Sequence, residues 1–471
     1  MLVAKRAFTL LFLCLRFVVS QSDTSLLPTS WENVQYSRTV DVSRSYTQES
    51  IDLQIKNVDD KPISEYYFVL PEDVFEKISL FSAKLRKVDA ILDSAILPQQ
   101  TFTANGKAVK VGVVQLPSPI EPGQEAKIVV NIAYNCNRQP YPGHVELGEK
   151  QSLRLSTNKY PISAYNTKTY SLGFKGSLSF SEQESVGSDA MACQMKGNTF
   201  SCVSQESVAA YRDPVPISVV FEHNLPLTRV TNLERAVWIS HWASTLQFEE
   251  YYELINDAAP LKSGFSRAEY MRGQHALKQS GHLTALEMVL PEDSEEHYFT
   301  DLVGAVSTFK VLKNHLFLKP RYPLFGGWKY NFTIGWTNQL SQFLRVEDAT
   351  QESYVLSVPA LNGPDDTFYD RMNLSVYLPE EAEVLDVWCP LPITSTEVTT
   401  EKSYFDLNKG HTKVSLELKN VVDTVARSEV FIRYKFSSTS FYKKPFSIAT
   451  SVFVVLMAYY LLKQTTYMIE E

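Results

Sequence analysis

Residues 238–256 read WISHWASTLQFEEYYELIN, and the second half of this stretch alternates in polarity. Apolar and polar residues fall on opposite parities, namely Leu246, Phe248, Tyr252 and Leu254 against Gln247, Glu249 and Glu253. Successive side chains of a strand point to opposite faces, whereas a helix repeats roughly every 3.6 residues. The stretch therefore predicts a strand buried on one face, in a unit that begins near Thr231.

Strand-like patterns fill most of the remaining chain. Between Trp31 and about Leu227, β-branched, aromatic or alternating runs are separated by turn residues, as in 51–55 (IDLQI), 66–70 (YYFVL) and 127–133 (KIVVNIA). Similar patterns resume up to 430–436. The predicted fold is mainly β, with two lumenal β-sandwich-like domains at 21–230 and 231–440, the first of them antiparallel, and a minor helical part.

One helix and one repeated motif punctuate these strands. The tetrapeptide 266–269 (SRAE) matches a capping box, and the predicted helix runs to about Ser280, before Gly281. The motif Leu-Pro-Glu followed by an acid occurs at 70–73, 290–293 and 378–381. Proline cannot continue a central ladder, so each copy predicts a strand exit. The three copies fit duplicated domains, although common turn chemistry explains them equally.

Composition narrows the class of protein. At roughly 150 residues per domain, 471 residues correspond to about three units or two large β domains. With 44% hydrophobic and 21% charged residues, the chain is neither disordered nor a polytopic membrane protein. Its 26 Phe and 25 Tyr favour strands. The net charge is -8 and no basic tract occurs, which argues against a nucleic-acid partner.

Residues 1–20 are predicted to be a cleaved secretory signal peptide. Lys5 and Arg6 precede a short apolar run, and Val18 and Ser20 place small residues before the cleavage site. An uncleaved anchor is the alternative, but the run is short for a span and Arg16 interrupts it. Because those three bases leave with the signal, 42 bases face 53 acids, and the mature chain carries -11.

Residues 446–462 (FSIATSVFVVLMAYYLL) are predicted to be a transmembrane helix. They carry no charge, follow Lys443 and Lys444, and precede Lys463. Seventeen residues span about 25 Å, which suits a thin bilayer such as that of the endoplasmic reticulum. A buried terminal helix is the alternative. With a cleaved signal, this span predicts a type I protein with a lumenal body and a cytosolic tail at 463–471.

Four cysteines remain once Cys14 leaves with the signal. Cys193 and Cys202 flank Gly197 and Asn198, which is good hairpin chemistry, so these two are the disulfide candidates. Formally, three pairings with Cys136 and Cys389 stay open. No Cys-x-x-Cys occurs and no histidine lies at ligand spacing from a cysteine, so we expect no metal site.

Sequence motifs of catalysis are missing. There is no Gly-x-Ser-x-Gly, no His-Glu-x-x-His, no Walker loop and no Gly-x-Gly-x-x-Gly, and so no catalytic residue or cofactor is predicted. The acid pairs 59–60 and 365–366 could serve a transferase, but their Pro and Asn neighbours favour solvated turns. In 238–252, Glu249 could act as a general acid, or the aromatic residues could form a peptide-binding groove. The plainer interpretation is a strand pair whose aromatics, including Trp242, fill a core in which His241 is hydrogen-bonded.

Two N-glycosylation sequons are present, at Asn331 (NFT) and Asn373 (NLS). Each lies in a predicted secreted segment, so each is a candidate glycan acceptor.

Several long blocks resemble the ribophorin I family, the alpha subunits of oligosaccharyltransferase. They lie at 238–256, 264–267 (GFSR), 297–310 (HYFTDLVGAVSTFK), 321–338 (RYPLFGGWKYNFTIGWTN), 403–411 (SYFDLNKGH) and 441–449 (FYKKPFSIA). The resemblance extends from 31–34 (WENV) to the predicted span, which is nearly the whole mature chain.

The resemblance implies a non-catalytic subunit of an endoplasmic reticulum complex. That complex transfers an oligosaccharide from dolichyl diphosphate to Asn in Asn-x-Ser/Thr of nascent chains, and its catalytic subunit is polytopic. The implied role is to stabilise the complex and to assist acceptor presentation, with the other subunits, the nascent chain and the membrane as partners. Asn331 lies inside a family block, whereas Asn373 rests on its sequon alone. Longer family members extend well beyond the short tail predicted here. The alternative function is a free-standing lumenal peptide-binding, chaperone-like protein.

Overall fold

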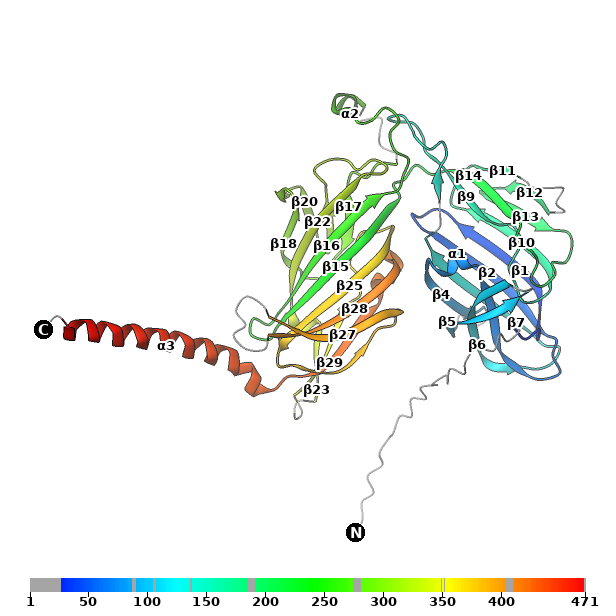
Figure 1. Ribbon diagram of the computed structural model, residues 1–471. Helices are drawn as coiled ribbons and strands as arrows, with labels where there is room; N and C mark the ends of the chain where they lie inside the picture. Colours follow the sequence, from blue (N-terminus) through cyan, green and yellow to red (C-terminus); the bar gives the residue numbers. More distant parts are fainter. Residues whose placement is uncertain are drawn as a thin grey trace, which may run out of the picture.

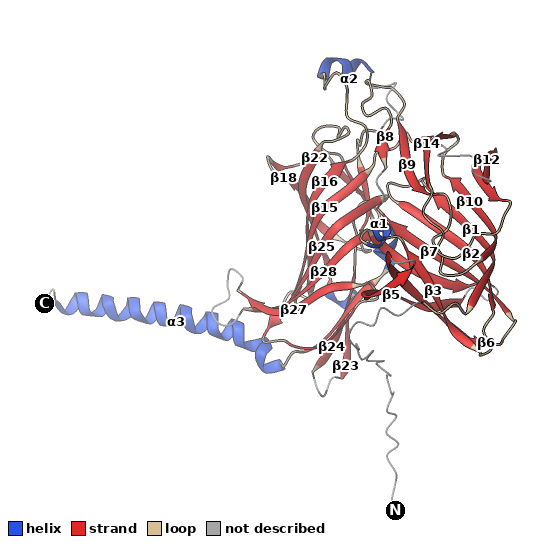
Figure 2. Cartoon of the chain, turned by 45° about the vertical axis from the view of Figure 1, so that its right-hand side comes forward, coloured by secondary structure: helices blue, strands red, loops and turns tan. Residues whose placement is uncertain are grey.

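The structure is a computed structural model that describes residues 27–86, 90–104, 107–135, 138–184, 191–273, 281–348, 350, 352–402 and 410–469. The predicted signal peptide, Cys136 and the end of the predicted tail lie outside the described residues. Two β-rich halves, residues 27–227 and 228–437, lie side by side, and a long helix extends away from the second half (Figures 1 and 2). The predicted mainly β fold is confirmed.

The first half contains two sheets. The larger has ten strands, in the order β12 (Met191–Lys196), β13 (Thr199–Ser204), β10 (Thr167–Lys175), β1 (Trp31–Asp41), β2 (Thr47–Asn57), β7 (Glu125–Tyr134), β4 (Ile78–Leu85), β5 (Ala90–Ala104), β6 (Lys107–Ile120) and β3 (Ile63–Leu70). The smaller has the order β11 (Phe180–Glu184), β14 (Pro216–Glu222), β9 (Ser152–Asn158) and β8 (Gln139–Pro140). A one-turn helix, α1 (Glu72–Phe75), follows β3.

The second half contains three sheets. The eight-stranded sheet has the order β19 (Gly304–Ala305), β18 (Glu295–Asp301), β22 (Lys329–Gln339), β16 (Thr245–Asn256), β15 (Thr228–Ser240), β25 (Thr367–Glu380), β28 (His411–Val422) and β27 (Ile393–Glu401). The others are β17 (Leu286–Val289), β21 (His315–Leu318) and β20 (Phe309–Leu312), and β23 (Leu344–Asp348), β24 (Ser353–Pro359), β29 (Glu429–Lys435) and β26 (Glu383–Trp388). The short helices are α2 (Arg267–Gly273) and the 3-10 turns η1 (Leu340–Gln342) and η2 (Asp423–Arg427).

The expectation of an antiparallel sandwich for the first half is wrong at β1, and the second half contains a parallel pair as well. Among the described strands, β1 pairs with β10 and β15 pairs with β25 in parallel. A parallel neighbour requires a long crossover connection, because the chain must return to the same end of the sheet before the second strand begins. In each half the intervening chain builds many of the other strands, β2 to β9 in the first half and β16 to β24 in the second, so local alternation carried no sign of the pairing.

Both halves repeat one arrangement. The first strand of each half lies between its hairpin partner and its parallel partner, giving β10-β1-β2-β7 and β25-β15-β16-β22. Each hairpin ends at an asparagine, Asn57 or Asn256, whose side-chain amide donates to two backbone carbonyls of other segments. A glycine with φ near +80°, Gly123 or Gly327, donates its N–H to the carbonyl of that asparagine. These matching details support the duplication of domains that the repeated Leu-Pro-Glu motif suggested.

A buried ion pair occupies each of these hairpins. Arg38 bonds Glu49 in the first, and Arg235 bonds Glu250 in the second. Each arginine lies seven residues after the start of its strand, at Trp31 or Thr228. Neither pair was predicted, because charged residues on a strand are normally assigned to the solvent face.

The two halves meet at the end of the eight-stranded sheet where β15 begins. Ser45 donates its backbone N–H to Asp366 Oδ1 at 2.8 Å, and Arg44 pairs with Asp423 at 2.8 Å. Shortly after the end of β16, a parallel bridge joins Leu261 to Val145 of the first half. Tyr46 of the first half is completely buried and belongs to the hydrophobic core of the second half. The contact is therefore partly a shared core.

The predicted strand exits and the start of the predicted helix are confirmed. At the three copies of the Leu-Pro-Glu motif, β3 ends at Leu70, β17 ends at Val289, and β25 ends at Glu380 after a bulge between Leu378 and Glu380. α2 begins where the capping box predicted, and Ser266 Oγ accepts the N–H of Glu269 at 3.4 Å. The rest of that predicted helix, 274–280, lies outside the described residues.

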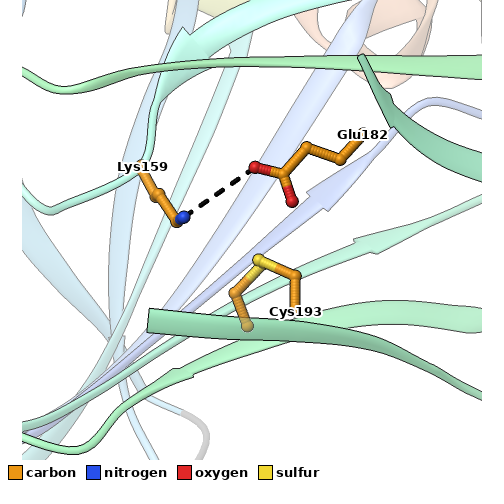
Figure 3. Close-up of a disulfide and its surroundings, with 4 residues drawn as sticks. Lys159, Glu182 and Cys193 are labelled. Atoms are coloured by element: carbon orange, nitrogen blue, oxygen red, sulfur yellow. Dashed lines mark ion pairs between the residues drawn. A yellow bond between two sulfur atoms is a disulfide. The ribbon is translucent and has the colours of Figure 1, made fainter. Parts of the chain in front are cut away.

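Cys193 and Cys202 form a disulfide between the facing strands β12 and β13. Figure 3 shows it beside Lys159 and Glu182, whose charged atoms lie 3.8 Å apart. Lys159 is 4% exposed, so this neighbourhood is sheltered. Cys389 is a free thiol among the described residues.

Replacing Cys193 and Cys202 by serine is expected to lower the free energy of unfolding of the first half by about 2–3 kcal/mol, because the crosslink restricts a short loop of the unfolded chain. Urea unfolding with and without reductant measures the effect. The matched control is Cys389→Ser, which removes a thiol without removing a crosslink and should leave the reductant dependence intact. Equal stability of the double variant and the parent chain under non-reducing conditions would contradict the prediction.

Candidate membrane-proximal junction

The stretch 238–256 forms the end of β15, the turn at 241–244 and the whole of β16 in the β15–β16 hairpin. The predicted alternation is confirmed: Leu246, Phe248, Tyr252 and Leu254 are buried, and Gln247 and Glu249 are exposed. In the turn, Ser240 Oγ accepts the N–H of Ala243 at 3.1 Å. Because this turn lies at the opposite end of the hairpin from Asn256, it lies far from the first half and next to α3 (Ser438–Ile469).

Trp242 does not fill a core, so that expectation is wrong. Its side chain is 55% exposed and stacks on Phe441 of α3, with ring centroids 4.5 Å apart and planes 5° from parallel. Trp242 Nε1 donates to the carbonyl of Phe441 at 2.9 Å. In a helix that carbonyl would accept the N–H of residue 445, but Pro445 has none. Trp242 therefore satisfies the backbone acceptor that the proline leaves open.

His241 is hydrogen-bonded within packed aromatic rings, as predicted. Nε2 lies 2.7 Å from Tyr434 Oη, and the ring contacts Tyr354 and Phe436. Burial lowers the pKa of His241 to about 4, because the imidazolium would lose hydration. The ring is therefore neutral at neutral pH, and it acts as a hydrogen-bonded packing element.

Acidic side chains hold the first turns of α3. Glu352 Oε1 accepts the N–H of Ser438 at 2.9 Å, which satisfies a free donor at the helix N-terminus. Glu381 pairs with Lys443, and Glu380 pairs with Lys444 at 3.0 Å. The third Leu-Pro-Glu motif thus supplies both carboxylates that meet the lysines preceding the predicted span.

A groove of about 350 Å³ lies between the hairpin turn and α3. Hereafter it is called the junction groove, and it is lined by Ile239, Ser240, His241, Trp242, Pro379, Glu380, His411, Phe436, Ser440, Phe441, Lys444, Pro445 and Ile448. Two blocks nearly two hundred residues apart in the sequence, 238–256 and 441–449, form its opposite walls.

The acidic residues considered for catalysis do not come together. Glu249 faces solvent halfway along β16 and accepts the hydroxyl of Tyr298 at 2.6 Å. Asp365 and Asp366 precede Thr367, which pairs with Thr228 at the far end of the sheet. Glu249 pairs with Ala236, eight residues further along β15, which corresponds to about 26 Å. Paired carboxylates of glycosidases lie roughly 5–9.5 Å apart, so these groups cannot act together.

Solvated turns are confirmed for Asp59, Asp60 and Asp365, which are exposed, but the expectation is wrong for Asp366. Asp366 accepts a hydrogen bond from the first half and is largely shielded from water. Burial, with a smaller effect of Asp423, raises the pKa of Asp366 from 3.8 to about 6. The described residues contain no cluster of His, Cys, Asp or Glu that could hold a metal ion.

Replacing Asp366 by asparagine is expected to stabilise the chain at neutral pH by about 1–2 kcal/mol. The folded chain holds the Asp366 proton more tightly than the unfolded chain, so the folded state is favoured below pH 3.8 and loses this contribution as the pH rises to about 6. An asparagine still accepts the Ser45 hydrogen bond without a charge. Urea unfolding across this pH range measures the change.

The control for this substitution is Asp60→Asn, which alters an exposed turn and should leave the pH profile as it is. If the free energy of unfolding of Asp366→Asn changed with pH between 3.8 and 6 as it does in the parent chain, another group would be responsible for that pH dependence.

Asn331 and Asn373, the predicted glycan acceptors, lie on the same solvent-facing side of the eight-stranded sheet, on β22 and β25. Asn331 Nδ2 donates to the hydroxyl of Tyr251 at 3.1 Å. Asn373 lines a shallow polar groove of about 530 Å³ together with Glu234, Trp238 and Tyr251. Glycan occupancy at both positions stays a prediction.

Among the described residues, α3 is long and apolar enough to cross a membrane over Ser438–Gln464, and none of that apolar window is buried in the protein. A β-rich body whose last strand leads into such a helix through a hydrogen-bonded junction fits a membrane-anchored β protein. The chain belongs to the Ribophorin I family, whose model matches residues 31–463. The resemblance seen in the sequence is thereby confirmed.

Curated relatives align with this chain over nearly its whole length. The chain is 26% identical over 447 residues to subunit 1 of dolichyl-diphosphooligosaccharide–protein glycosyltransferase from Schizosaccharomyces pombe, covering 93% of this chain and 96% of the relative. It is 27% identical to subunit 1B from Arabidopsis thaliana, covering 90% and 91%. Among solved structures, native yeast LTA4 hydrolase aligns with a TM-score of 0.28 and 10% identity over 42% of this chain and 30% of that chain, too weakly to bear on function.

Proposed function

We propose that the chain is a non-catalytic subunit of the oligosaccharyltransferase of the endoplasmic reticulum membrane, which transfers a preassembled glycan from dolichyl diphosphate to Asn of Asn-x-Ser/Thr in nascent polypeptides. The catalytic residues lie on another, polytopic chain of that complex. The observation that carries the proposal is the match to the Ribophorin I family over 31–463, which includes both β halves and α3. Relatives named as subunit 1 match over the same extent.

The proposed topology is single-pass type I. The signal peptide at 1–20 is removed, domains 21–230 and 231–440 face the lumen, residues 446–462 span the membrane and 463–471 form the cytosolic tail. The Cys193–Cys202 disulfide supports a lumenal body, because disulfides persist in oxidising compartments. Protease added to sealed microsomes should remove only a few residues, and digestion of the whole body would contradict this orientation.

The proposed role is to stabilise the complex through α3 as well as through the β body. Ser447, Ser451 and Ala458 lie on one face of α3 by their spacing of four and seven residues, which permits close approach of another helix. Ala449, which shares their small size, lies on the opposite face. The junction then transmits the position of that helix to the β body, because Glu380 and Glu381 fix the lysines at its base.

Affinity purification from gently solubilised membranes tests this role. The parent chain should recover partner subunits together with glycosyltransferase activity toward an acceptor peptide. The variant Ser451→Leu/Ala458→Leu should recover less of both, while Val452→Leu/Leu456→Met, on the opposite side of α3, should match the parent. Recovery of the parent chain with neither partners nor activity would overturn the proposal.

Assistance in acceptor presentation is the finer part of the proposal. The polar groove on the open sheet face is lined by aromatic and acidic side chains, including Trp238, Glu249 and Tyr251, which suit an extended peptide. A photo-crosslinking residue in place of Tyr251 should capture stalled nascent chains, whereas one in place of the exposed Ile91 of the first half should not. Capture that persists without the catalytic subunit would favour the alternative, a free-standing chaperone-like protein.

A further inference from the structure

The junction groove is open toward the part of α3 that is exposed and apolar. Its α3 wall consists of Ser440, Phe441, Lys444, Pro445 and Ile448, which recur at three- and four-residue spacing on one face of the helix. Pro445 directly precedes the uncharged run 446–462, and Ile448 lies inside it. The lower end of the groove, at Pro445 and Ile448, is therefore continuous with the helix surface that a bilayer would surround.

Polarity changes along the groove in the order that a bilayer surface requires. The charged side chains of Lys444 and Glu380 lie on the side of the β body, and the apolar Pro445 and Ile448 lie on the side of the apolar run. The indole of Trp242, which stacks on Phe441 one turn before Pro445, is 55% exposed. Tryptophan prefers the region between hydrocarbon and headgroups, because its ring is apolar and its N–H is polar.

Charge restricts the kind of ligand. Lys444 and Glu380 lie 3.0 Å apart and compensate each other, with side chains 31% and 14% exposed. Lys443 is compensated by Glu381 in the same way. His241 is uncharged at neutral pH because its pKa is lowered to about 4 by burial. The Lys444–Glu380 pair therefore presents two adjacent opposite charges that compensate each other, which matches a zwitterionic headgroup better than an anionic one.

We propose that the junction groove binds one zwitterionic phospholipid of the bilayer, with its headgroup beside the Lys444–Glu380 pair and its hydrocarbon against Trp242, Pro445 and Ile448. A volume of about 350 Å³ is at the lower end of the range of ligand sites, which suits the glycerol region and the first part of an acyl chain while the rest stays in the bilayer. The lipid would fill the space between hairpin turn and helix and so stiffen the junction. This inference rests on α3 crossing a membrane and is independent of the proposed enzymatic complex.

Tryptophan quenching by brominated lipid tests whether the turn reaches the bilayer. The full chain is reconstituted into nanodiscs of phosphatidylcholine that carries bromine at shallow acyl positions. We expect part of the emission of the six tryptophans to be quenched, and most of that quenching to be lost in Trp242→Phe. The matched control is Trp388→Phe, which removes an indole of equal exposure, 56%, that packs on Phe431 of β29, away from α3. Bromine near the acyl ends should quench less.

Native mass spectrometry of the same preparations tests the groove itself. One phosphatidylcholine should stay with the parent chain after mild delipidation and should be lost with Ile448→Phe, which fills the lower groove with an apolar ring. Val452→Phe adds the same ring one turn further along α3, outside the groove, and should retain the lipid. In nanodiscs that contain equal phosphatidylcholine and phosphatidylglycerol, the retained lipid should be phosphatidylcholine.

Three results would overturn the inference. Quenching that is unchanged by Trp242→Phe would place the turn away from the bilayer. Lipid retained equally by both phenylalanine variants, or by neither the parent nor the variants, would show that the groove holds none. Preferential retention of phosphatidylglycerol would refute the argument from compensated charge.

Discussion

Replacing Glu250 by alanine is expected to lower the free energy of unfolding of the second half by about 3–5 kcal/mol, because it leaves the Arg235 guanidinium charged and buried without its partner. Both side chains are completely buried and face each other directly in the β15–β16 hairpin. The remaining partners of Arg235 are the carbonyl of Pro359 and the side chain of Asn362, at 3.1 and 2.6 Å. Neither carries the negative charge that offsets the desolvation of the guanidinium.

The neighbouring residue on the same strand supplies the control. Glu249→Ala removes an identical side chain that points to solvent and should change stability by less than about 1 kcal/mol. The double variant Arg235→Met/Glu250→Leu removes both charges at similar volume and should recover most of the loss. Urea unfolding followed by near-UV circular dichroism measures all three. If Glu250→Ala lowered the free energy of unfolding no more than Glu249→Ala, water would have to reach Arg235 and Glu250, and the pair could not be buried as described.

Replacing Phe248 by alanine is expected to cost about 3–5 kcal/mol, because it removes a buried ring and leaves a cavity. Phe248 is 2% exposed and stacks on Trp336, with ring centroids 5.0 Å apart and planes 13° from parallel. Phe343 closes the ring edge at 5.8 Å, and the guanidinium of Arg235 lies 5.1 Å from the ring centroid. These rigid neighbours allow little collapse into the vacated space.

Trp242→Ala on the same hairpin provides the contrast. It removes a larger ring but from an exposed stack, together with one hydrogen bond to Phe441, so the expected cost is about 1 kcal/mol. The same unfolding series compares the two variants. If Trp242→Ala lowered the free energy of unfolding as much as Phe248→Ala, Trp242 would have to be a core residue, contrary to its 55% exposure.

Local alternation was sufficient to predict the strand character of the hairpin and the burial of Phe248, since both depend only on neighbours in the chain. It could not predict Glu250, although this residue shares the parity of Phe248 and Tyr252. A buried glutamate becomes acceptable only when Arg235 faces it across the hairpin, and alternation along one strand does not specify the register that brings the two residues together. Charged residues on the apolar parity of two successive strands would have been the signal.

The junction escaped prediction for a different reason. The aromatic character of Trp242 suggested a core, whereas its position is set by Phe441 and Pro445, some two hundred residues later. The proline inside an otherwise regular apolar helix was the available signal, because it leaves one carbonyl in need of a donor. The parallel partner of β15 was hidden likewise, since β25 begins at Thr367 and nothing local distinguishes a parallel from an antiparallel neighbour.

The hairpin β15–β16 also sets a length. β15 has 13 residues, and at about 3.3 Å per residue its two ends lie roughly 40 Å apart. One end meets α3 at the predicted bilayer surface, and the other, next to Asp366, carries the first half. The length of the hairpin therefore sets the reach of the first half, that is, its distance from α3. Because side chains alternate with period two, adding two residues to each strand would extend this reach by about 7 Å while every side chain kept its face.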